Sequence, residues 1–216
     1  MLLRRHLAEF TGTALLVMAV VGSGIMAQFL SRDVGVQLLA NAVATGGALF
    51  ALITVFAPVS GASFNPVVSV VSHVLDGGSL RVLAGDVVAQ FAGAVVGCWA
   101  ANIMFARPWL ELSTTDRSDG PRWFSEVLAM FGLLLVIRGG QRARANVAAL
   151  VAAWITGAYW FTSSTSVANP AVGFGRMFSD SFAGIAPASW TVFAGMQVLG
   201  GAVALVVLPV LFPRGE

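Results

Sequence analysis

Long apolar stretches with few or no charged residues alternate with short segments in which most of the arginines and carboxylates gather. About 20 apolar residues are needed to cross the ~30 Å hydrocarbon core of a bilayer. Two stretches of about this length, 7–29 and 82–105, predict membrane-spanning helices, and a weaker, shorter stretch with Glu126 near its start predicts another at about 123–138. Three other charge-free stretches are too long for a single crossing: 34–75, 145–175 and 181–213.

Two Asn-Pro pairs, at 65–66 and 169–170, divide the first two of these long stretches. Proline fits the first turn of a helix, where its missing N–H would have no partner, and asparagine is a good N-cap. Each pair therefore predicts the start of a short helix of roughly ten residues. The remaining residues predict three further spans at about 34–56, 145–161 and 188–211. Pro58 is expected to break the helix after the first of these spans.

The two short helices are about half as long as a crossing. The segment from Asn65 to Leu75 would form a helix of about 11 residues, ~16 Å long. Three full crossings separate the two Asn-Pro pairs, so the short helices enter the bilayer from opposite faces and meet near its middle. Non-helical backbone at this depth is tolerated only where protein or a water-filled cavity covers it, which predicts a binding or conduction site.

Three markers recur in the same order in both halves of the chain. A glutamate opens the first and fourth spans (Glu9 and Glu126), an Asn-Pro pair follows, and Gln-x-x-Gly lies at 90–93 and 197–200. An odd number of spans per half predicts an inverted repeat, with substrate sites at the repeat interface. We therefore predict an all-α membrane protein with six transmembrane helices and two re-entrant half-helices. It forms a single domain, 1–216, whose halves at about 1–106 and 122–216 are joined by an outer loop, 107–121.

Composition agrees with a membrane protein, because 57% of the residues are hydrophobic and only 10% are charged, against roughly 25% charged residues in soluble domains. All twelve basic residues are arginine and are dispersed at the ends of the spans, so no nucleic-acid partner is expected. Cytoplasmic segments carry an excess of basic residues. With both termini cytoplasmic, seven arginines fall inside (Arg4, Arg5, Arg81, Arg138, Arg142, Arg144 and Arg214) and five outside (Arg32, Arg107, Arg117, Arg122 and Arg176).

The sequence offers no catalytic or metal-binding pattern at membrane depth. Cys98 is the only cysteine, and His6 and His73 lie far apart, so neither a disulfide nor a metal site is expected. No Ser/His, paired-Asp or His-Glu zinc pattern occurs in the spans. The chain is therefore not expected to be an enzyme or to need a cofactor.

The sequences around the Asn-Pro pairs, at 60–67 and 168–171, resemble the paired Asn-Pro-Ala motifs of the aquaporin (major intrinsic protein) family. The Glu and Gln-x-x-Gly markers and Trp190 agree, and the resemblance covers nearly the whole chain. It implies a multi-pass protein of the bacterial inner membrane, a homotetramer in the lipid bilayer whose protomers each conduct small neutral solutes passively. It also implies a pore lined by the Asn-Pro motifs (Asn65, Pro66, Val67, Asn169, Pro170 and Ala171) and by the preceding backbone (Gly61, Ala62, Ser63, Phe64, Thr165, Val167 and Ala168).

In this family a four-residue filter forms the narrowest point on the outer side. By the resemblance its positions are Thr45, Gly157, Ser166 and Val172. The family has an arginine where this chain has Val172, so the filter is expected to be wide and uncharged. In this respect the chain resembles an aquaglyceroporin-type branch of bacterial channels associated with arsenic handling. The expected solutes are water, glycerol-like polyols, and arsenite or methylated arsenic species.

Three assignments stay open. By the resemblance Glu9 and Glu126 are buried supports for the loop backbone, whereas carboxylates in a membrane are also candidates for a proton relay. Arg176 lies seven residues after Asn169 and either replaces the missing filter arginine or is an outer-vestibule charge or a partner for Asp180. An inverted repeat with broken helices also occurs in secondary transporters. A transporter would need ionisable residues near the middle of the bilayer, and the sequence has none beside the Asn-Pro pairs.

Overall fold

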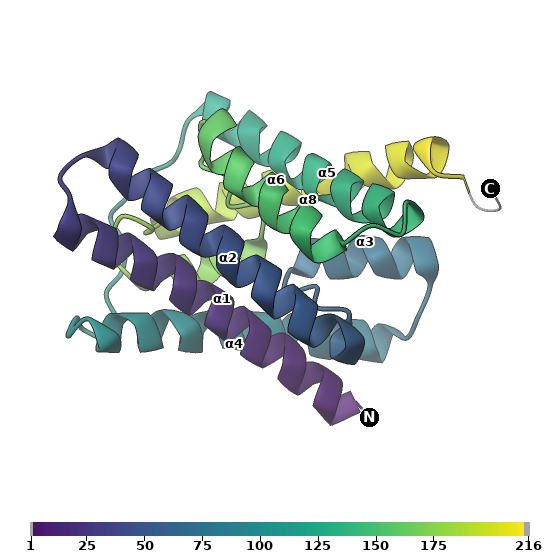
Figure 1. The fold of residues 1–216 in the computed structure, drawn as a ribbon, viewed down its shortest axis with the longest axis horizontal. Helices are drawn as coiled ribbons and strands as arrows, with labels where there is room; N and C mark the ends of the chain where they lie inside the picture. The colour runs from purple at the N-terminus through teal and green to yellow at the C-terminus, as the bar shows by residue number, and fades with distance from the viewer. Residues whose placement is uncertain (1, 214–216) are drawn as a thin grey trace.

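The computed structural model describes residues 2–213. Eight helices make up the regular secondary structure of these residues, which contain no strand. Arg214, which the sequence assigns to the cytoplasmic side, lies outside the described residues. Five helices are long and apolar enough to cross a membrane: α1, α2, α4, α5 and α8. The helices, shown in Figure 1, are α1 (Leu2–Leu30), α2 (Val34–Ser60), α3 (Pro66–Asp76), α4 (Leu80–Met104), α5 (Gly120–Arg142), α6 (Val147–Phe161), α7 (Pro170–Arg176) and α8 (Pro187–Leu211).

Helix α2 does not break at Pro58, as the sequence predicted, but continues to Ser60. A proline inside a helix removes one hydrogen bond to the preceding turn. Here it removes that bond only in the last turn, and the helix ends two residues later, at Ser60. Gly61 then takes φ 90°, and its N–H donates to the carbonyl of Ala57.

Two other helices are shorter than the pattern predicts. Helix α6 has 15 residues, which corresponds to ~22 Å and is less than the ~30 Å thickness of the hydrocarbon core. Helix α7 has seven residues rather than about ten. In both regions the chain leaves the helix to form irregular backbone, which lies inside the bundle.

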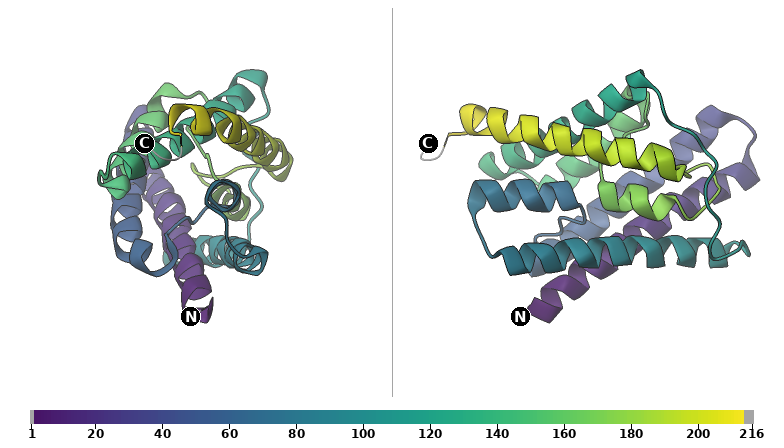
Figure 2. Two further views of the ribbon diagram at one scale, coloured as in Figure 1. Left: turned by 90° about the vertical axis from the view of Figure 1, so that its right-hand side faces the viewer. Right: turned by 180° about the vertical axis from the view of Figure 1, so that it is seen from behind.

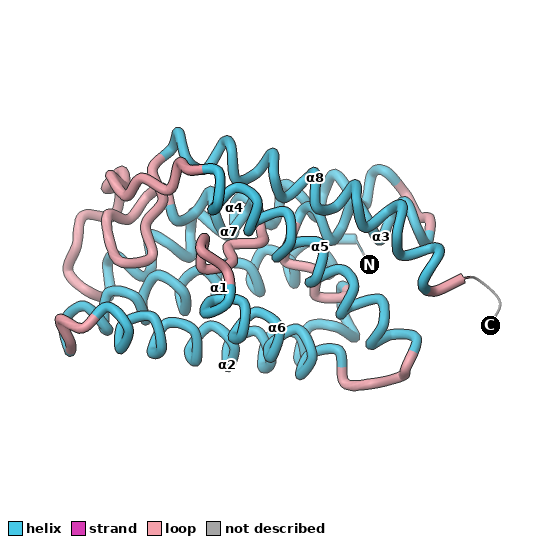
Figure 3. Tube along the Cα trace, turned by 90° about the horizontal axis from the view of Figure 1, so that it is seen from above, coloured by secondary structure: helices cyan, strands magenta, loops and turns pink. Residues whose placement is uncertain are grey.

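The long helices pack in two matching groups. Helix α1 lies against α4 and α2, and α5 lies against α8 and α6, while α2 and α6 join the two groups. The short helices α3 and α7 lie nearly in line between α4 and α8, with their N-terminal ends facing each other (Figure 2). Figure 3 shows the irregular segments that lead into them as loops in the interior of the bundle.

Glycines allow the closest helix contacts. A Cβ added at Gly93 of α4 would lie 2.3 Å from the carbonyl oxygen of Phe10 in α1, and one at Gly97 would lie 2.1 Å from that of Ala14. In the other group, a Cβ at Gly200 of α8 would lie 2.6 Å from the carbonyl oxygen of Val127 in α5. Small residues at helix contacts let backbones approach closely in membrane proteins. The Gln-x-x-Gly markers therefore have a packing role.

We expect Gly97→Ala to destabilise the fold by roughly 1–3 kcal/mol, the usual cost of overpacking, because the added methyl group collides with the backbone of α1. The matched control is Gly47→Ala in α2, where an added Cβ meets nothing within 4 Å; alanine is favoured over glycine in a helix by roughly 0.5–1 kcal/mol. Thermal unfolding in detergent should show a lower midpoint for the first variant only. Equal midpoints would contradict the packing role.

Candidate functional site

Each short helix begins at the asparagine of an Asn-Pro pair. The Asn65 side-chain oxygen accepts hydrogen bonds from the backbone N–H groups of Val67 (3.0 Å) and Val68 (3.5 Å). The Asn169 oxygen accepts from those of Ala171 (3.0 Å) and Val172 (3.1 Å). Both asparagines are extended N-caps with proline in the first turn, as the sequence predicts.

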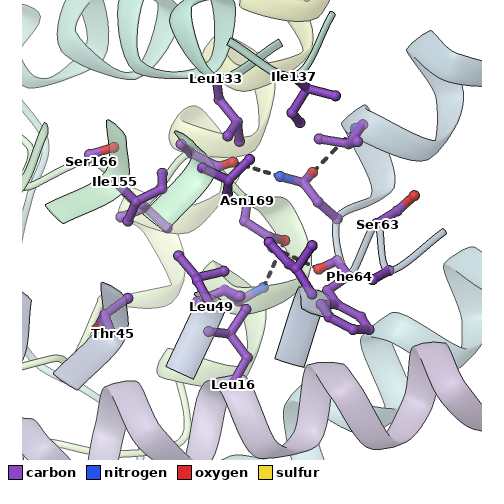
Figure 4. A pocket seen from close by; sticks show the side chains of 18 of the residues that line it. Leu16, Thr45, Leu49, Ser63, Phe64, Leu133, Ile137, Ile155, Ser166 and Asn169 are labelled. Atoms are coloured by element: carbon purple, nitrogen blue, oxygen red, sulfur yellow. Dashed lines mark hydrogen bonds between the residues drawn. The ribbon is translucent and has the colours of Figure 1, made fainter. Parts of the chain in front are cut away.

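The two asparagines also join the loops to each other. The amide nitrogen of Asn65 donates to the carbonyl oxygen of Ala168, and that of Asn169 donates to the carbonyl oxygen of Phe64, both at 2.7 Å. The side chains are buried, with 3% and 7% of their residues' surface exposed. The sequence expectation that the short helices meet end to end is therefore seen as a reciprocal pair of hydrogen bonds (Figure 4).

The loop before α3 is held by Glu9 of α1, which is fully buried. One carboxylate oxygen accepts hydrogen bonds from the Ser60 hydroxyl (2.5 Å) and the Ser63 N–H (3.1 Å). The other accepts from the Phe64 N–H and from the Gln90 side-chain amide, both at 2.8 Å. A single carboxylate thus binds four donors from the loop and its surroundings.

Glu126 of α5 holds the loop before α7 in the same way, and it is also fully buried. Its two oxygens accept hydrogen bonds from the N–H groups of Val167 and Ala168, both at 2.9 Å, and one of them accepts from the Gln197 amide at 2.6 Å. Five non-glycine residues of the two loops have φ between 44° and 60°: Ala62, Phe64, Thr165, Ser166 and Ala168. Such backbone costs of order 1–3 kcal/mol per residue, and hydrogen bonds to a charged acceptor, worth roughly 1.5–3 kcal/mol each, offset that cost.

One cavity passes both asparagines. The empty space along it, including space open to solvent, amounts to about 910 Å³. It reaches Gln141, near the C-terminal end of α5, and Arg176, at the C-terminal end of α7. Beside the polar loops its wall is apolar, with Leu16, Leu49, Leu133 and Ile155 around the asparagine amides in Figure 4, and with Val20, Ile53, Ile137, Val147 and Val151.

Three of the four filter positions expected from the sequence, Thr45, Ser166 and Val172, line this cavity, whereas Gly157 does not. The lining residues of α6 are spaced four apart: Val147, Val151, Ile155 and Tyr159. Gly157 lies two residues from the nearest of these, which corresponds to ~200° around the helix, so it faces away from the cavity. The expectation that Gly157 lines the pore is therefore wrong, because the rotation of α6 turns this residue away from the cavity.

Tyr159 takes the place expected for Gly157. Its hydroxyl lies 3.1 Å from the hydroxyl of Thr45, so an aromatic ring and a hydrogen-bonded pair of hydroxyl groups form the cavity wall here. The four-residue spacing of apolar positions in α6 is the signal that could have identified Tyr159 from the sequence.

The remaining residues expected at the pore divide into two groups. Gly61, Ala62, Ser63, Phe64, Val167 and Ala168 line the cavity. Pro66, Val67, Pro170 and Ala171 are not part of its wall but are buried in the first turns of α3 and α7. Thr165 is not part of the wall either, and its hydroxyl instead lies 3.4 Å from a guanidinium nitrogen of Arg117.

Arg176 is not an outer charge paired with Asp180. It is buried, with 2% of its surface exposed, it lines the cavity, and its Nε donates to the carbonyl oxygen of Ala183. Asp180 instead accepts hydrogen bonds from the N–H and hydroxyl of Thr114. No ion pair of Arg176 occurs within residues 2–213.

Arg117, in the loop between α4 and α5, reaches the same region. Its guanidinium donates to the carbonyl oxygens of Gly184 (3.2 Å) and Phe182 (3.3 Å) and to the Thr165 hydroxyl. Burial, together with the positive charge of Arg176, lowers the pKa of Arg117 to about 9, so it still carries its charge at pH 7. The sequence contained no signal for the contact of Arg117 with the segment 182–184, because this contact depends on the path of a long loop.

Within the described part of the chain, no group of three or more His, Cys, Asp or Glu side chains is arranged to hold a metal ion. The cavity wall contains one charged residue, Arg176, and no carboxylate. The arrangement therefore provides hydrogen-bond donors and acceptors along an otherwise apolar passage.

The chain is similar to several known proteins over almost all of its length. It is 46% identical over 208 residues to Aquaglyceroporin AqpS of Rhizobium meliloti, which covers 96% of this chain and 89% of that protein. It is 31% identical over 230 residues to a probable TIP-type aquaporin of Medicago truncatula, covering 97% and 87%.

The fold is also similar to a solved structure. The X-ray structure of the aquaglyceroporin from Plasmodium falciparum superposes with a TM-score of 0.80, covers 99% of this chain and 98% of that chain, and has 22% sequence identity. The sequence matches the family described as Major intrinsic protein over residues 1–160. Together with the 46% identity over nearly the whole chain, this match establishes that the protein belongs to the major intrinsic protein (aquaporin) family.

Proposed function

We propose that the protein is a passive transmembrane channel for small neutral solutes. The observation that carries this proposal is the position of the two asparagine amides, which lie at the crossing of two loops and on the wall of one cavity. That cavity extends from Gln141 on one side of the crossing to Arg176 on the other. The similarity to a protein named as an aquaglyceroporin supports the same conclusion.

The asparagine amides have donors left for a solute. An amide nitrogen carries two hydrogens, and each Nδ2 donates one hydrogen bond, to Ala168 or to Phe64, among residues 2–213. The second N–H of each amide is therefore free to donate to a passing hydroxyl group. Because the opposite wall is apolar, a solute finds its hydrogen-bond partners on one side of the passage only.

We propose that the halves 1–106 and 122–216 form an inverted repeat joined by the outer loop, 107–121. The matching roles of Glu9 with Gln90 and of Glu126 with Gln197, each holding one loop, support this symmetry. The excess of arginine at one set of helix ends favours cytoplasmic termini in a bacterial inner membrane. Large apolar side chains remain exposed on the long helices, for example Phe29, Val88 and Val206, and suit contact with lipid or with the other protomers of a homotetramer.

The solutes we propose are water, glycerol-like polyols, and arsenite or methylated arsenic species. Val172 stands where the family has an arginine, so the filter is formed by Thr45, Tyr159, Ser166 and Val172, whose side chains are uncharged. The hydroxyl groups of Thr45 and Tyr159 can bind a polyhydroxylated solute. Ion-coupled transport is not supported, because the described cavity wall contains no carboxylate that could bind a coupling ion.

Purified protein in lipid vesicles should raise the flux of water, glycerol and arsenite above that of protein-free vesicles. Stopped-flow light scattering and uptake assays measure these rates. The flux should not depend on an imposed proton or sodium gradient, because passive conduction needs none. No flux of any of the three solutes, or flux that requires a gradient, would refute the channel proposal.

Val172→Arg should narrow the filter and lower glycerol and arsenite flux by about tenfold, an effect that corresponds to ~1.4 kcal/mol on the barrier, while water flux falls less. Val172→Ile keeps the site uncharged and is the matched control. Both variants are compared with wild type at equal protein density in vesicles. Equal losses for water and glycerol in Val172→Arg would argue against a filter at this position.

Glu126→Gln should destabilise the fold by ~1–3 kcal/mol, the cost of leaving a buried donor unsatisfied. Either orientation of the new amide turns an NH₂ group toward the N–H of Val167 or Ala168. The control Glu111→Gln removes a partly exposed ion pair with Arg107, for which ~0–1 kcal/mol is expected. Thermal unfolding in detergent measures both, and similar midpoints would contradict the support role of Glu126.

A further inference from the structure

Arg176 is a buried arginine with unused donors. Its Nε donates to the carbonyl of Ala183, and neither Nη atom forms a hydrogen bond with the described residues. Both Nη atoms nevertheless keep some accessible surface and are not fully enclosed by protein. Since Arg176 lines the cavity, its Nη groups face the space through which a solute would pass. Burying an unpaired cation is costly, so water or solute in the cavity is needed to satisfy it.

The position of Arg176 on α7 explains how it reaches the filter. Arg176 follows Val172 by four residues, which places both on the same face of the helix, ~6 Å apart along its axis. Side chains on a helix tilt toward its N-terminus. This tilt directs the Arg176 side chain toward the turn that contains Val172, and its Nε donates to the carbonyl oxygen of Ala183. Both residues line the cavity together with Ser166 and Tyr159.

A second guanidinium lies nearby. Arg117 is fixed by the carbonyl groups of Gly184 and Phe182 and by the Thr165 hydroxyl, and its backbone N–H donates to Ser189 at 2.9 Å. Arg176 donates to the carbonyl oxygen of Ala183, which lies in the chain between these two carbonyl groups, so the two guanidinium groups are held by one short segment. Burial and the charge of Arg176 lower the pKa of Arg117 to about 9. Asp116, the adjacent carboxylate, accepts hydrogen bonds from Ser189 and Ser118 and does not pair with either arginine.

We propose that Arg176, assisted by Arg117, supplies the cationic donor of the filter that Val172 cannot supply. The inference rests on the proposed channel function. Positive charge in a narrow, low-dielectric passage repels cations. The free Nη donors bind the hydroxyl oxygens of neutral solutes, so the filter rejects sodium and potassium while polyols pass. Arg176 thus gives the filter a positive charge, although it lies one helical turn beyond Val172, the position at which the family has its arginine.

The test compares sodium leak with glycerol flux in the same vesicles. Arg176→Gln should raise sodium leak about tenfold or more above wild type, and Arg117→Gln should raise it less. Arg176→Lys, which keeps the charge, should keep the leak low. The control Arg122→Gln removes a surface ion pair with Asp119, whose side chains are 38% and 46% exposed, and should leave both rates unchanged.

The double variant Val172→Arg with Arg176→Gln should restore low sodium leak, because an arginine again lies at the filter. A folded Arg176→Gln channel that conducts glycerol and leaks no more sodium than wild type would overturn the inference while leaving the channel function intact. Absence of glycerol flux in wild type would instead count against the channel itself. If Arg176→Gln does not fold, an unchanged sodium leak in Arg117→Gln overturns the inference.

Discussion

Irregular backbone inside a bilayer must find partners for its N–H groups, and this constraint governs the structure. Two buried carboxylates, Glu9 and Glu126, meet it by accepting hydrogen bonds from the loops before α3 and α7. The loops can then adopt strained, left-handed conformations and bring Asn65 and Asn169 into reciprocal contact. Without these bonds the unpaired groups would cost several kcal/mol each in hydrocarbon, and the passage would have no polar wall.

Close helix packing also helps to hold the two loops. Gly93 and Gly97 let α4 approach α1, and Gly200 lets α8 approach α5, so that Gln90 and Gln197 reach the two carboxylates. The glutamate, glutamine and glycine markers of each half therefore act as one unit, in which packing positions a polar cluster and the cluster positions a loop. The two arginines near this region are held differently, because carbonyl groups of the segment 182–184 accept hydrogen bonds from the Arg176 side chain of α7 and from Arg117 of an outer loop.

Periodicity and helix-start chemistry were sufficient to predict the eight helices. The two asparagines were recognisable as caps, because asparagine is a good N-cap and proline fits the first turn of a helix. Details that depend on helix phase and length could not be predicted from these patterns. Gly157 was expected at the filter by counting from Asn169, but the phase of α6 turns Tyr159 to the cavity instead. Pro58 was expected to end α2, yet a proline in the last turn costs only one hydrogen bond, and the helix continues to Ser60.

The sequence by itself determined the membrane class, the order of the spans and the asparagines that cap the short helices, because these follow from local hydrophobicity and hydrogen-bonding capacity. The support role of Glu9 and Glu126 was an implication of the family resemblance, and the hydrogen bonds of the structure assign it. Only the tertiary structure decided which side chains meet at the filter. Thr45, Tyr159 and Arg176 line the cavity from two long helices and a half-helix that are distant in sequence. Their juxtaposition depends on helix rotation and loop path, and neither of these is encoded in any short pattern of residues.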